Sequence, residues 1–187
     1  PLIADDQSAA VALATEVIQT FPVRFEHFYR AGLQRKIGLT EAREGDVVLA
    51  QDLLTRMAEN AADFTLTFRR LSDGVGESAR NDAAVSGLFE DPAVFDEWAV
   101  RWRHRLAIEG RSAAERQRDM RSVNPAFIPR NHRLEEVIKA AVDEGDLAPF
   151  EQLVEVLASP YDEQPSQERY AAPPRPEQIV RETFCGT

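Results

Sequence analysis

Few side chains in this sequence have the types and spacing that metal or redox chemistry requires. The histidines, His27, His104 and His132, are far apart, with no H-x-x-x-H pair and no neighbouring cysteine. Zinc sites use closely spaced ligands, so we expect helix-surface or capping roles for them. The single cysteine, Cys185, is third from the end of the sequence and has no partner for an internal disulfide. A lone terminal cysteine is more often inert than functional, although its thiol would be accessible.

A glycine pattern from Gly74 to Ala79 matches G-x-G-x-x-A, which in dinucleotide-binding folds cradles a pyrophosphate. That function needs a β-strand directly before the first glycine, and the preceding letters, TFRRLSD, have a helical pattern instead. We therefore interpret residues 72–78 as a polar loop and expect no bound cofactor in this chain. Acid pairs at 135–136 and 143–144 are adjacent, so they lie on different helix faces and do not form a catalytic dyad.

Cationic side chains are concentrated between residues 101 and 121, where seven arginines accompany only three acidic residues. Such an excess could bind phosphates or an acidic partner. More often it is a solvated or ion-paired helix face, and we favour that interpretation. The arginines are Arg101, Arg103, Arg105, Arg111, Arg116, Arg118 and Arg121.

A second polar cluster, Arg130-Asn131-His132-Arg133, directly precedes an apolar helical pattern. One interpretation is local, with Asn131 capping the helix and the arginines solvated. In the other, the cluster docks this part of the chain on a neighbouring domain. We keep both, with Arg130 and Asn131 as candidate interdomain contacts.

The elements that must position these residues are predicted to be helices throughout, because apolar residues recur every three or four positions. No alternating β-branched run exceeds about four residues, so we expect no strand. Pro22 should end a first helix over residues 5–19. A second should stop near Gly38 in a Schellman motif, and Thr40 or Asp46 should cap a third. Apolar residues expected in the third and fourth helices are Leu49, Leu53, Leu54, Met57, Phe64, Phe68 and Leu71.

The clearest helix start is Asp91-Pro92, a capping residue followed by proline at the first helical position. Gly110 should end this helix, and Ser112-x-x-Glu115 is a capping box for the next. The two tryptophans lie four residues apart on one face, so we expect core packing and not a base-stacking platform. The residues expected to be buried are Phe95, Trp98, Trp102 and Leu106.

The stretch from 124 to 165 predicts a helical hairpin. Pro125 and Pro129 exclude regular helix just before it. Gly145 can supply a left-handed stop and Asp146 the next cap, before Ser159-Pro160 ends the second helix. The two apolar faces expected to pack together are Leu134, Val137, Ile138, Ala141 and Val142, and Leu147, Phe150, Leu153, Val154 and Leu157.

The 187 residues have the length of one domain. We divide them into a helical domain, 1–158, and a Pro-rich tail, 159–187, which holds five of the 11 prolines. The tail should be extended, either laid on a surface or loose, and should lack regular helix over 165–176. The sequence begins with Pro1 and not methionine, which suggests a trimmed piece.

Composition excludes several classes of function. A net charge of −10 argues against non-specific binding to nucleic acid or to a membrane surface, because both favour cationic proteins. No apolar run approaches the ~20 residues that span a bilayer, and no signal-peptide pattern precedes the first helix. With a single cysteine, the chain fits a reducing compartment, and we expect a cytoplasmic protein.

Several segments, in this order, carry a resemblance to a known family. They are RFEHFYRAGLQRKIGL (24–39), DFTLTFRRLS (63–72), NPAFIPRN (124–131), the EGD joint (144–146), SPYDEQP (159–165) and the cysteine near the end. Together they resemble the C-terminal part of the selenoprotein O / YdiU family. The resemblance implies a kinase-like fold in the full-length protein and transfer of AMP from ATP to protein hydroxyl groups.

The resemblance implies that this chain supports and redox-regulates a catalytic domain and does not carry the active site itself. Phosphate-covering, ATP-pairing and metal-binding kinase signatures are absent from these residues, so no catalytic residue is carried over. ATP and magnesium are implied for the full-length protein only. The implied partners are its N-terminal catalytic domain and its protein substrates. By resemblance, Cys185 would form a redox link to the catalytic domain. The alternative is a free-standing helical interaction module without enzymatic activity.

Overall fold

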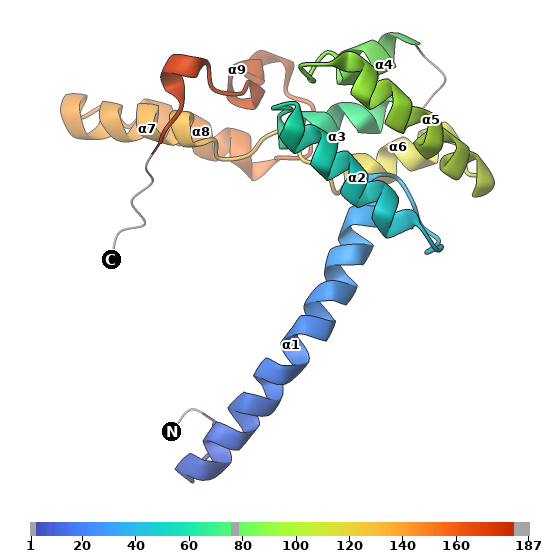
Figure 1. Cartoon of the computed structure of the whole chain (residues 1–187). Helices are drawn as coiled ribbons and strands as arrows, with labels where there is room; N and C mark the ends of the chain where they lie inside the picture. The colour runs from blue at the N-terminus through green and yellow to red at the C-terminus, as the bar shows by residue number, and fades with distance from the viewer. Residues whose placement is uncertain (1–2, 76–78, 182–187) are drawn as a thin grey trace.

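Every regular element in residues 3–75 and 79–181, the part of the chain that this computed structural model describes, is a helix. In chain order the α-helices are α1 (Gln7–Lys36), α2 (Asp46–Glu59), α3 (Phe64–Asp73), α4 (Ala79–Ser86), α5 (Pro92–Ile108), α6 (Ala113–Arg121), α7 (Asn131–Lys139), α8 (Ala148–Ala158) and α9 (Glu168–Ala171). The predicted all-α fold is confirmed. Figure 1 shows α2–α6 gathered into a body, from which α1 projects in one direction and the α7–α8 pair in another.

The larger hydrophobic core lies where the end of α1 meets α2–α6. Trp98 and Trp102 of α5 are fully buried and stack, with 5.5 Å between ring centroids. Their indole N–H groups donate to the carbonyl oxygens of Leu49 at 2.9 Å and Ile37 at 2.7 Å, so burial leaves neither nitrogen unpaired. The predicted core role of this aromatic stripe is confirmed. Other buried members include Leu53, Met57, Phe68, Leu71, Phe95 and Leu106.

Helix α1 runs unbroken for 30 residues, which corrects the predicted break at Pro22. A proline removes one N–H donor, but the residues on both sides of this one have a helical pattern, and the helix continues through it. The C-terminal end is as predicted. Gly38 has φ +80°, its N–H donates to Arg35 O, and Leu39 N–H donates to Gln34 O, the two bonds of a Schellman motif.

Helix starts follow the predicted caps at two places. Asp91 accepts a hydrogen bond from the N–H of Ala93, the second residue of α5, and Ser112 accepts one from the N–H of Glu115, the third residue of α6. The start of α2 is a correction, because neither Thr40 nor Asp46 caps it. Its N-cap is Gly45, with φ +89° and no side-chain bond to the helix. Asp46 is instead buried, with its carboxylate bonded to an arginine of α5.

Helices α7 and α8 form the predicted hairpin around a second, smaller core. Gly145 has the predicted left-handed φ, +68°. The N-cap of α8 is Leu147, which corrects the predicted Asp146 cap, although the Asp146 carboxylate accepts a hydrogen bond from Ala148 N–H at 3.0 Å. Directly after α7, Ala140–Glu144 forms a π-helical turn that extends this helix as far as Gly145. Val137, Leu153 and Val156 are the buried contacts of the hairpin, together with Ala126, Phe127 and Tyr170.

The hairpin's predicted apolar faces are only partly buried, which is a further correction. A single neighbouring helix covers a strip narrower than a full apolar face, so the outer residues stay in solvent. We call these exposed residues the hairpin face. They are Ile138, Val142, Leu147, Phe150 and Val154, with exposed fractions from 51% to 76%.

The tail is more ordered than predicted as far as the structure follows it. Helix α9 lies within the stretch expected to lack regular helix, and 3-10 turns flank it at Pro165–Gln167 and Pro176–Gln178. Tyr170 explains this, because its ring is 2% exposed in the hairpin core and its hydroxyl donates to Gln152 Oε1 at 2.9 Å. Burying an aromatic ring offsets the cost of ordering a short turn. Cys185 lies outside the described residues.

The predicted polar loop at 72–78 begins later than expected. Helix α3 continues to Asp73, and α4, which the sequence analysis did not predict, begins at Ala79. Residues 76–78 lie outside the described part. Among the helices that the structure describes, none is long and apolar enough to cross a membrane.

Candidate functional site: a polar seam between two cores

A buried polar seam joins the body to the hairpin, and Asn124 lies at its centre. Asn124 is in the loop between α6 and α7 and is fully buried. Its amide Nδ2 donates to Lys36 O at 2.9 Å and to Ser72 Oγ at 3.2 Å, and its Oδ1 accepts from Lys36 Nζ at 3.1 Å. One side chain therefore connects the end of α1, the end of α3 and the loop. Burial lowers the pKa of the Lys36 ammonium.

Arg69 of α3 extends this seam toward the tail. Its guanidinium is buried and donates to Asn124 O at 3.1 Å and to the carboxylate of Glu163. Glu163 also lies 3.7 Å from the guanidinium of Arg121 on α6. Arg121 in turn bonds to Asp73 at the end of α3. Glu163 of the SPYDEQP segment is therefore held by cations from two helices of the body.

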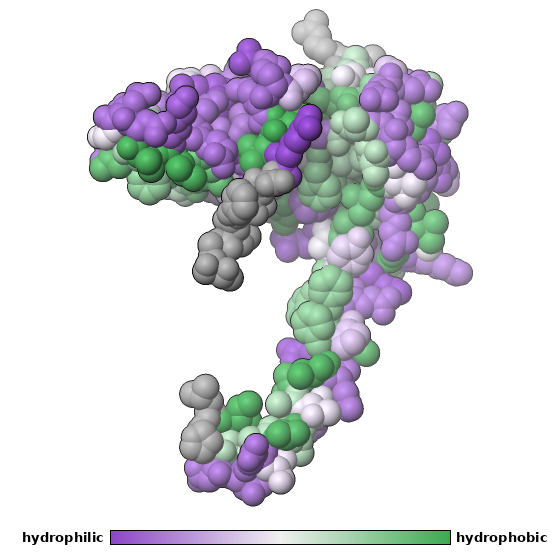
Figure 2. Space-filling view, turned by 60° about the vertical axis from the view of Figure 1, so that its left-hand side comes forward, coloured by the Kyte–Doolittle hydropathy of each residue, from purple (hydrophilic) through white to green (hydrophobic). Residues whose placement is uncertain are grey.

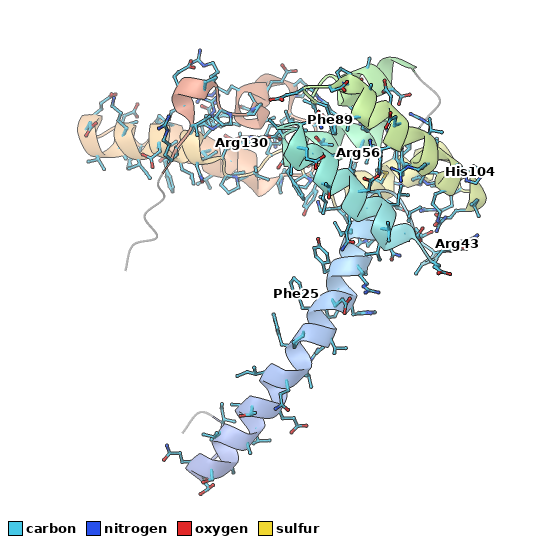
Figure 3. The ribbon with its side chains drawn as sticks, in the orientation of Figure 1. Phe25, Arg43, Arg56, Phe89, His104 and Arg130 are labelled. Atoms are coloured by element: carbon cyan, nitrogen blue, oxygen red, sulfur yellow. The ribbon has the colours of Figure 1, made fainter. Side chains whose placement is uncertain are left out.

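Arg130 forms the third connection, by a bidentate pair with Asp63. The two guanidinium nitrogens lie 2.8 Å and 3.0 Å from the two carboxylate oxygens, and Figure 3 places Arg130 where the hairpin joins the body. Asp63 also caps α3, accepting from Leu66 N–H at 2.8 Å. Burial favours the neutral form of Asp63, but the bonds from Arg130 and Leu66 outweigh it and lower the pKa of the carboxyl.

These contacts settle part of the prediction for this cluster. Arg130 is 7% exposed and ion-paired within the chain, so it is not the solvated arginine of the local interpretation. Asn131 is exposed, and α7 begins with Arg130 at its N-cap and no side-chain cap, which corrects the expected Asn131 cap. Contact of Arg130 or Asn131 with another domain stays a prediction.

Main-chain bonds complete the seam. The N–H groups of Ala126 and Phe127 donate to Pro160 O at 2.8 Å and 3.1 Å. Gln164 Nε2 donates to the carbonyl oxygens of Val156 and Ser159, both at 3.0 Å, which ties the SPYDEQP turn to the end of α8. The NPAFIPRN, DFTLTFRRLS and SPYDEQP segments, far apart in sequence, therefore meet at one place in the fold.

The arginines of residues 101–121 are largely ion-paired, as favoured from the sequence. Arg105 and Arg116 are buried and not solvated, and both lie close to Glu109 at the end of α5. Arg105 also forms two bonds with Asp46, at 2.6 Å and 3.0 Å. The remaining pairs are Arg101 with Asp52, Arg103 with Asp82, Arg111 with Asp119 and Arg121 with Asp73.

The other candidates are not brought together. His27 and His104 are exposed, whereas His132 is 4% exposed, with no hydrogen-bond partner for Nε2 among the described residues. Burial and the nearby Arg133 lower the pKa of His132. Within 3–75 and 79–181, no three histidine, cysteine or acidic side chains converge on a point where a metal could bind. Gly74 follows helix α3 and not a strand, so the dinucleotide pattern lacks its structural context.

Sequence analysis missed the seam as a connected set. Asp63, Arg69, Asn124 and Glu163 all stand inside segments singled out for their resemblance. One signal in the sequence was that these polar residues stand beside residues predicted to be buried. A buried polar side chain needs a hydrogen-bond partner. Helical periodicity alone does not say which partner it finds.

Comparison with known proteins places these segments in a family. The family described as "Protein adenylyltransferase SelO" matches residues 6–158. Proteins named "Protein nucleotidyltransferase YdiU" match the whole chain, at 56% identity in Bradyrhizobium diazoefficiens, 54% in Bradyrhizobium sp. (strain ORS 278) and 52% in Methylorubrum extorquens. The chain spans only 38% to 39% of the length of these curated relatives. The resemblance seen in the sequence is confirmed, and the chain belongs to the SelO family of protein adenylyltransferases.

Proposed function

We propose that this chain is the helical C-terminal part of a protein adenylyltransferase and that it supports a catalytic part located elsewhere in the same protein. One observation carries the proposal. The chain is 56% identical over all 187 residues to a protein named as a nucleotidyltransferase, yet it spans 38% of that protein. The activity proposed for the full-length protein is transfer of AMP from ATP to hydroxyl groups of protein substrates.

The polar residues of the chain support a structural role. Arg69, Arg130 and Asn124 each form hydrogen bonds to other residues of this chain, and these bonds fix the hairpin on the body. The described residues also offer no set of ligands for magnesium. We therefore assign ATP and magnesium to the part of the full-length protein outside this chain.

The test compares the chain with the full-length protein. Each is incubated with ATP labelled in the adenosine part, magnesium and a protein acceptor, and transfer is followed as acceptor-bound label. We expect transfer by the full-length protein and none by the 187-residue chain. Chain-dependent labelling by the 187 residues would contradict the proposal, because an active site would then lie within them. A full-length protein that transfers no label would favour the free-standing interaction module.

A redox role for Cys185 is the second part of the proposal. Its only support is the resemblance and its position near the end of the sequence, where a thiol is accessible for exchange with a disulfide. A disulfide partner has to come from outside this chain, which has no second cysteine. In full-length protein equilibrated with oxidised glutathione, peptide mapping without reductant should recover Cys185 in a disulfide with the catalytic part. Recovery as a free thiol, with Cys185→Ser unchanged in activity, would contradict it.

A further inference from the structure

Helix α1 is long, and the residues that the structure describes leave it almost entirely uncovered. Thirty residues correspond to about 45 Å of helix. Leu33 is the one buried residue of α1, and Ile37, which follows it at the C-cap, is also buried. The N-terminal turns extend away from the body, as Figure 1 shows. Only the C-terminal end of α1 packs against the body, whereas most helical stability in proteins comes from tertiary contacts.

The uncovered part of α1 is apolar along one side. Phe21, Phe25 and Tyr29 form a ladder of stacked rings, with 5.8 Å between each pair of centroids. Figure 3 shows Phe25 midway along the projecting helix, distant from the body. We call this side the α1 face. It consists of Val17, Ile18, Phe21, Phe25, Phe28 and Tyr29, with exposed fractions from 40% to 70%.

The hairpin face lies across an open angle from the α1 face. Figure 2 shows hydrophobic residues along α1 and along the lower side of the α7–α8 arm, the side turned toward the space beside α1. Large contiguous apolar patches are rare on the surface of monomeric soluble proteins. Two of them bordering the same space indicate that one body of substantial size is seated there.

We infer that the rest of the same full-length protein occupies the angle between α1 and the hairpin, packing its own apolar residues on the α1 face and the hairpin face. This inference rests on the proposed function. The relatives that match this chain throughout have more than half of their length outside the match, so a covalently attached body is available. A covalent link raises the effective concentration of such a body at the angle.

A second copy of this chain fits these observations less well. Two α1 helices paired along their aromatic ladders would cover the α1 face and leave the hairpin face in water. A single folded body in the angle covers both. The polar residues Arg69, Asn124 and Arg130 of the seam do not contribute, because they are buried and bonded to other residues of the chain. The contact is therefore predominantly apolar.

The chain contains a matched control for this contact. Val23 is an apolar residue of α1 with 73% of its surface exposed, two positions from Phe25. Two residues of helix correspond to a rotation of about 200°, so Val23 lies on the side opposite the α1 face. Substituting aspartate at Val23 adds the same charge to the same helix without touching the proposed contact.

The experiment is limited trypsin digestion of the full-length protein, followed at Arg24 and Arg30 of α1. Both are cleavage sites within the projecting stretch, and cleavage there requires local opening of the helix. We expect slow cleavage in the wild type and in Val23→Asp, and cleavage at least ~10-fold faster in Phe25→Asp. If the Phe25→Asp protein does not accumulate in the expression host, Phe25→Ala should also speed cleavage at Arg24 and Arg30, by a smaller factor. Light scattering on the same samples records the oligomeric state.

Three results would overturn the inference. Rapid cleavage at Arg24 and Arg30 in the wild-type monomer would mean that α1 is uncovered. Equal rates in Phe25→Asp and Val23→Asp would mean that the α1 face makes no contact. Slow cleavage found only in dimers would assign the face to a second copy. AMP transfer is measured in parallel, so a protected α1 without transfer rejects the proposed function alone, and transfer with an open α1 rejects this inference alone.

Discussion

Helices α5 and α1 both carry aromatic side chains four residues apart, yet one set is buried and the other is exposed. Trp98 and Trp102 of α5 stack at 5.5 Å and have no exposed surface. Phe21 and Phe25 of α1 stack at 5.8 Å and are 63% and 56% exposed. The spacing in the sequence is the same. The difference is that α5 packs against neighbouring helices of this chain, whereas the long projecting part of α1 has no such neighbour among residues 3–75 and 79–181.

The comparison teaches that helical periodicity identifies a face to be covered without identifying its partner. Within the 187 residues, α5 is surrounded by the end of α1 and by α2, α4 and α6, so its stripe becomes core. For α1 and the outer side of the hairpin, the complementary surface has to come from elsewhere. A chain that spans 38% of the length of its relative is expected to have apolar faces that its own residues do not cover.

The largest contrast should appear when one aromatic ring of each helix is removed. In the 187-residue chain, Trp102→Ala should reduce the free energy of unfolding by ~3–5 kcal/mol, from lost transfer energy and the cavity left behind. Phe25→Ala in the same chain should change it by less than ~0.5 kcal/mol, since the ring is in solvent. Denaturant unfolding measures both. A cost below ~1 kcal/mol for Trp102→Ala would mean that the stripe of α5 is not core.

A smaller effect is expected from breaking the seam that holds the hairpin on the body. Arg130→Met leaves the Asp63 carboxylate without its bidentate partner and should cost ~1.5–3 kcal/mol, as for other hydrogen bonds to charged groups. Asp63→Asn keeps an acceptor for Leu66 N–H and removes the unpaired charge. Combined with Arg130→Met, it should therefore recover part of the loss. Strictly additive losses in the double variant would show that the two residues do not interact.

The buried His132 should make stability depend on pH. Its pKa is lowered from 6.5 by burial, so the unfolded chain binds the proton more tightly than the folded chain. Stability should be fully present above about pH 6.5 and should fall as the pH drops toward the lower pKa of the folded state. His132→Gln should flatten this part of the profile, while the exposed His104→Gln should preserve it. Identical slopes in wild type and His132→Gln would exclude His132 as the cause.

The smallest contrast concerns the helix caps. Asp91 caps α5 and Asp6 caps α1, each by accepting a main-chain hydrogen bond. Asp91→Ala should cost ~1 kcal/mol in the isolated chain. Asp6→Ala should cost almost nothing in thermal or denaturant unfolding, because the free end of α1 can fray without opening the core. Comparable losses would mean that α1 unfolds together with the body.

Much of the fold could be predicted from local signals. Asp91-Pro92, Ser112 and Gly38 mark helix ends by interactions within a few residues, and all three act as expected. Pro22 is a position where the rule that proline ends a helix fails, since α1 continues through it as one helix. The tail fails for a non-local reason, the burial of Tyr170 in the hairpin core.

The seam was not predictable in the same way. Arg130 finds Asp63, 67 positions away, and Arg69 finds Glu163, 94 positions away. Such pairs depend on how the helices pack, which periodicity does not encode. The resemblance located the segments that carry them without showing that they meet.

The central claim is that the α1 face is covered by the rest of the full-length protein, while α5 is covered by this chain alone. Amide hydrogen exchange measured on α1 and α5, in the 187-residue chain and in the full-length monomer, tests it directly. We predict slow exchange in α5 in both, with α1 amides of residues 10–30 at least ~100-fold slower in the full-length protein than in the chain. Equal exchange of α1 in the two proteins, whether fast or slow, would contradict the account.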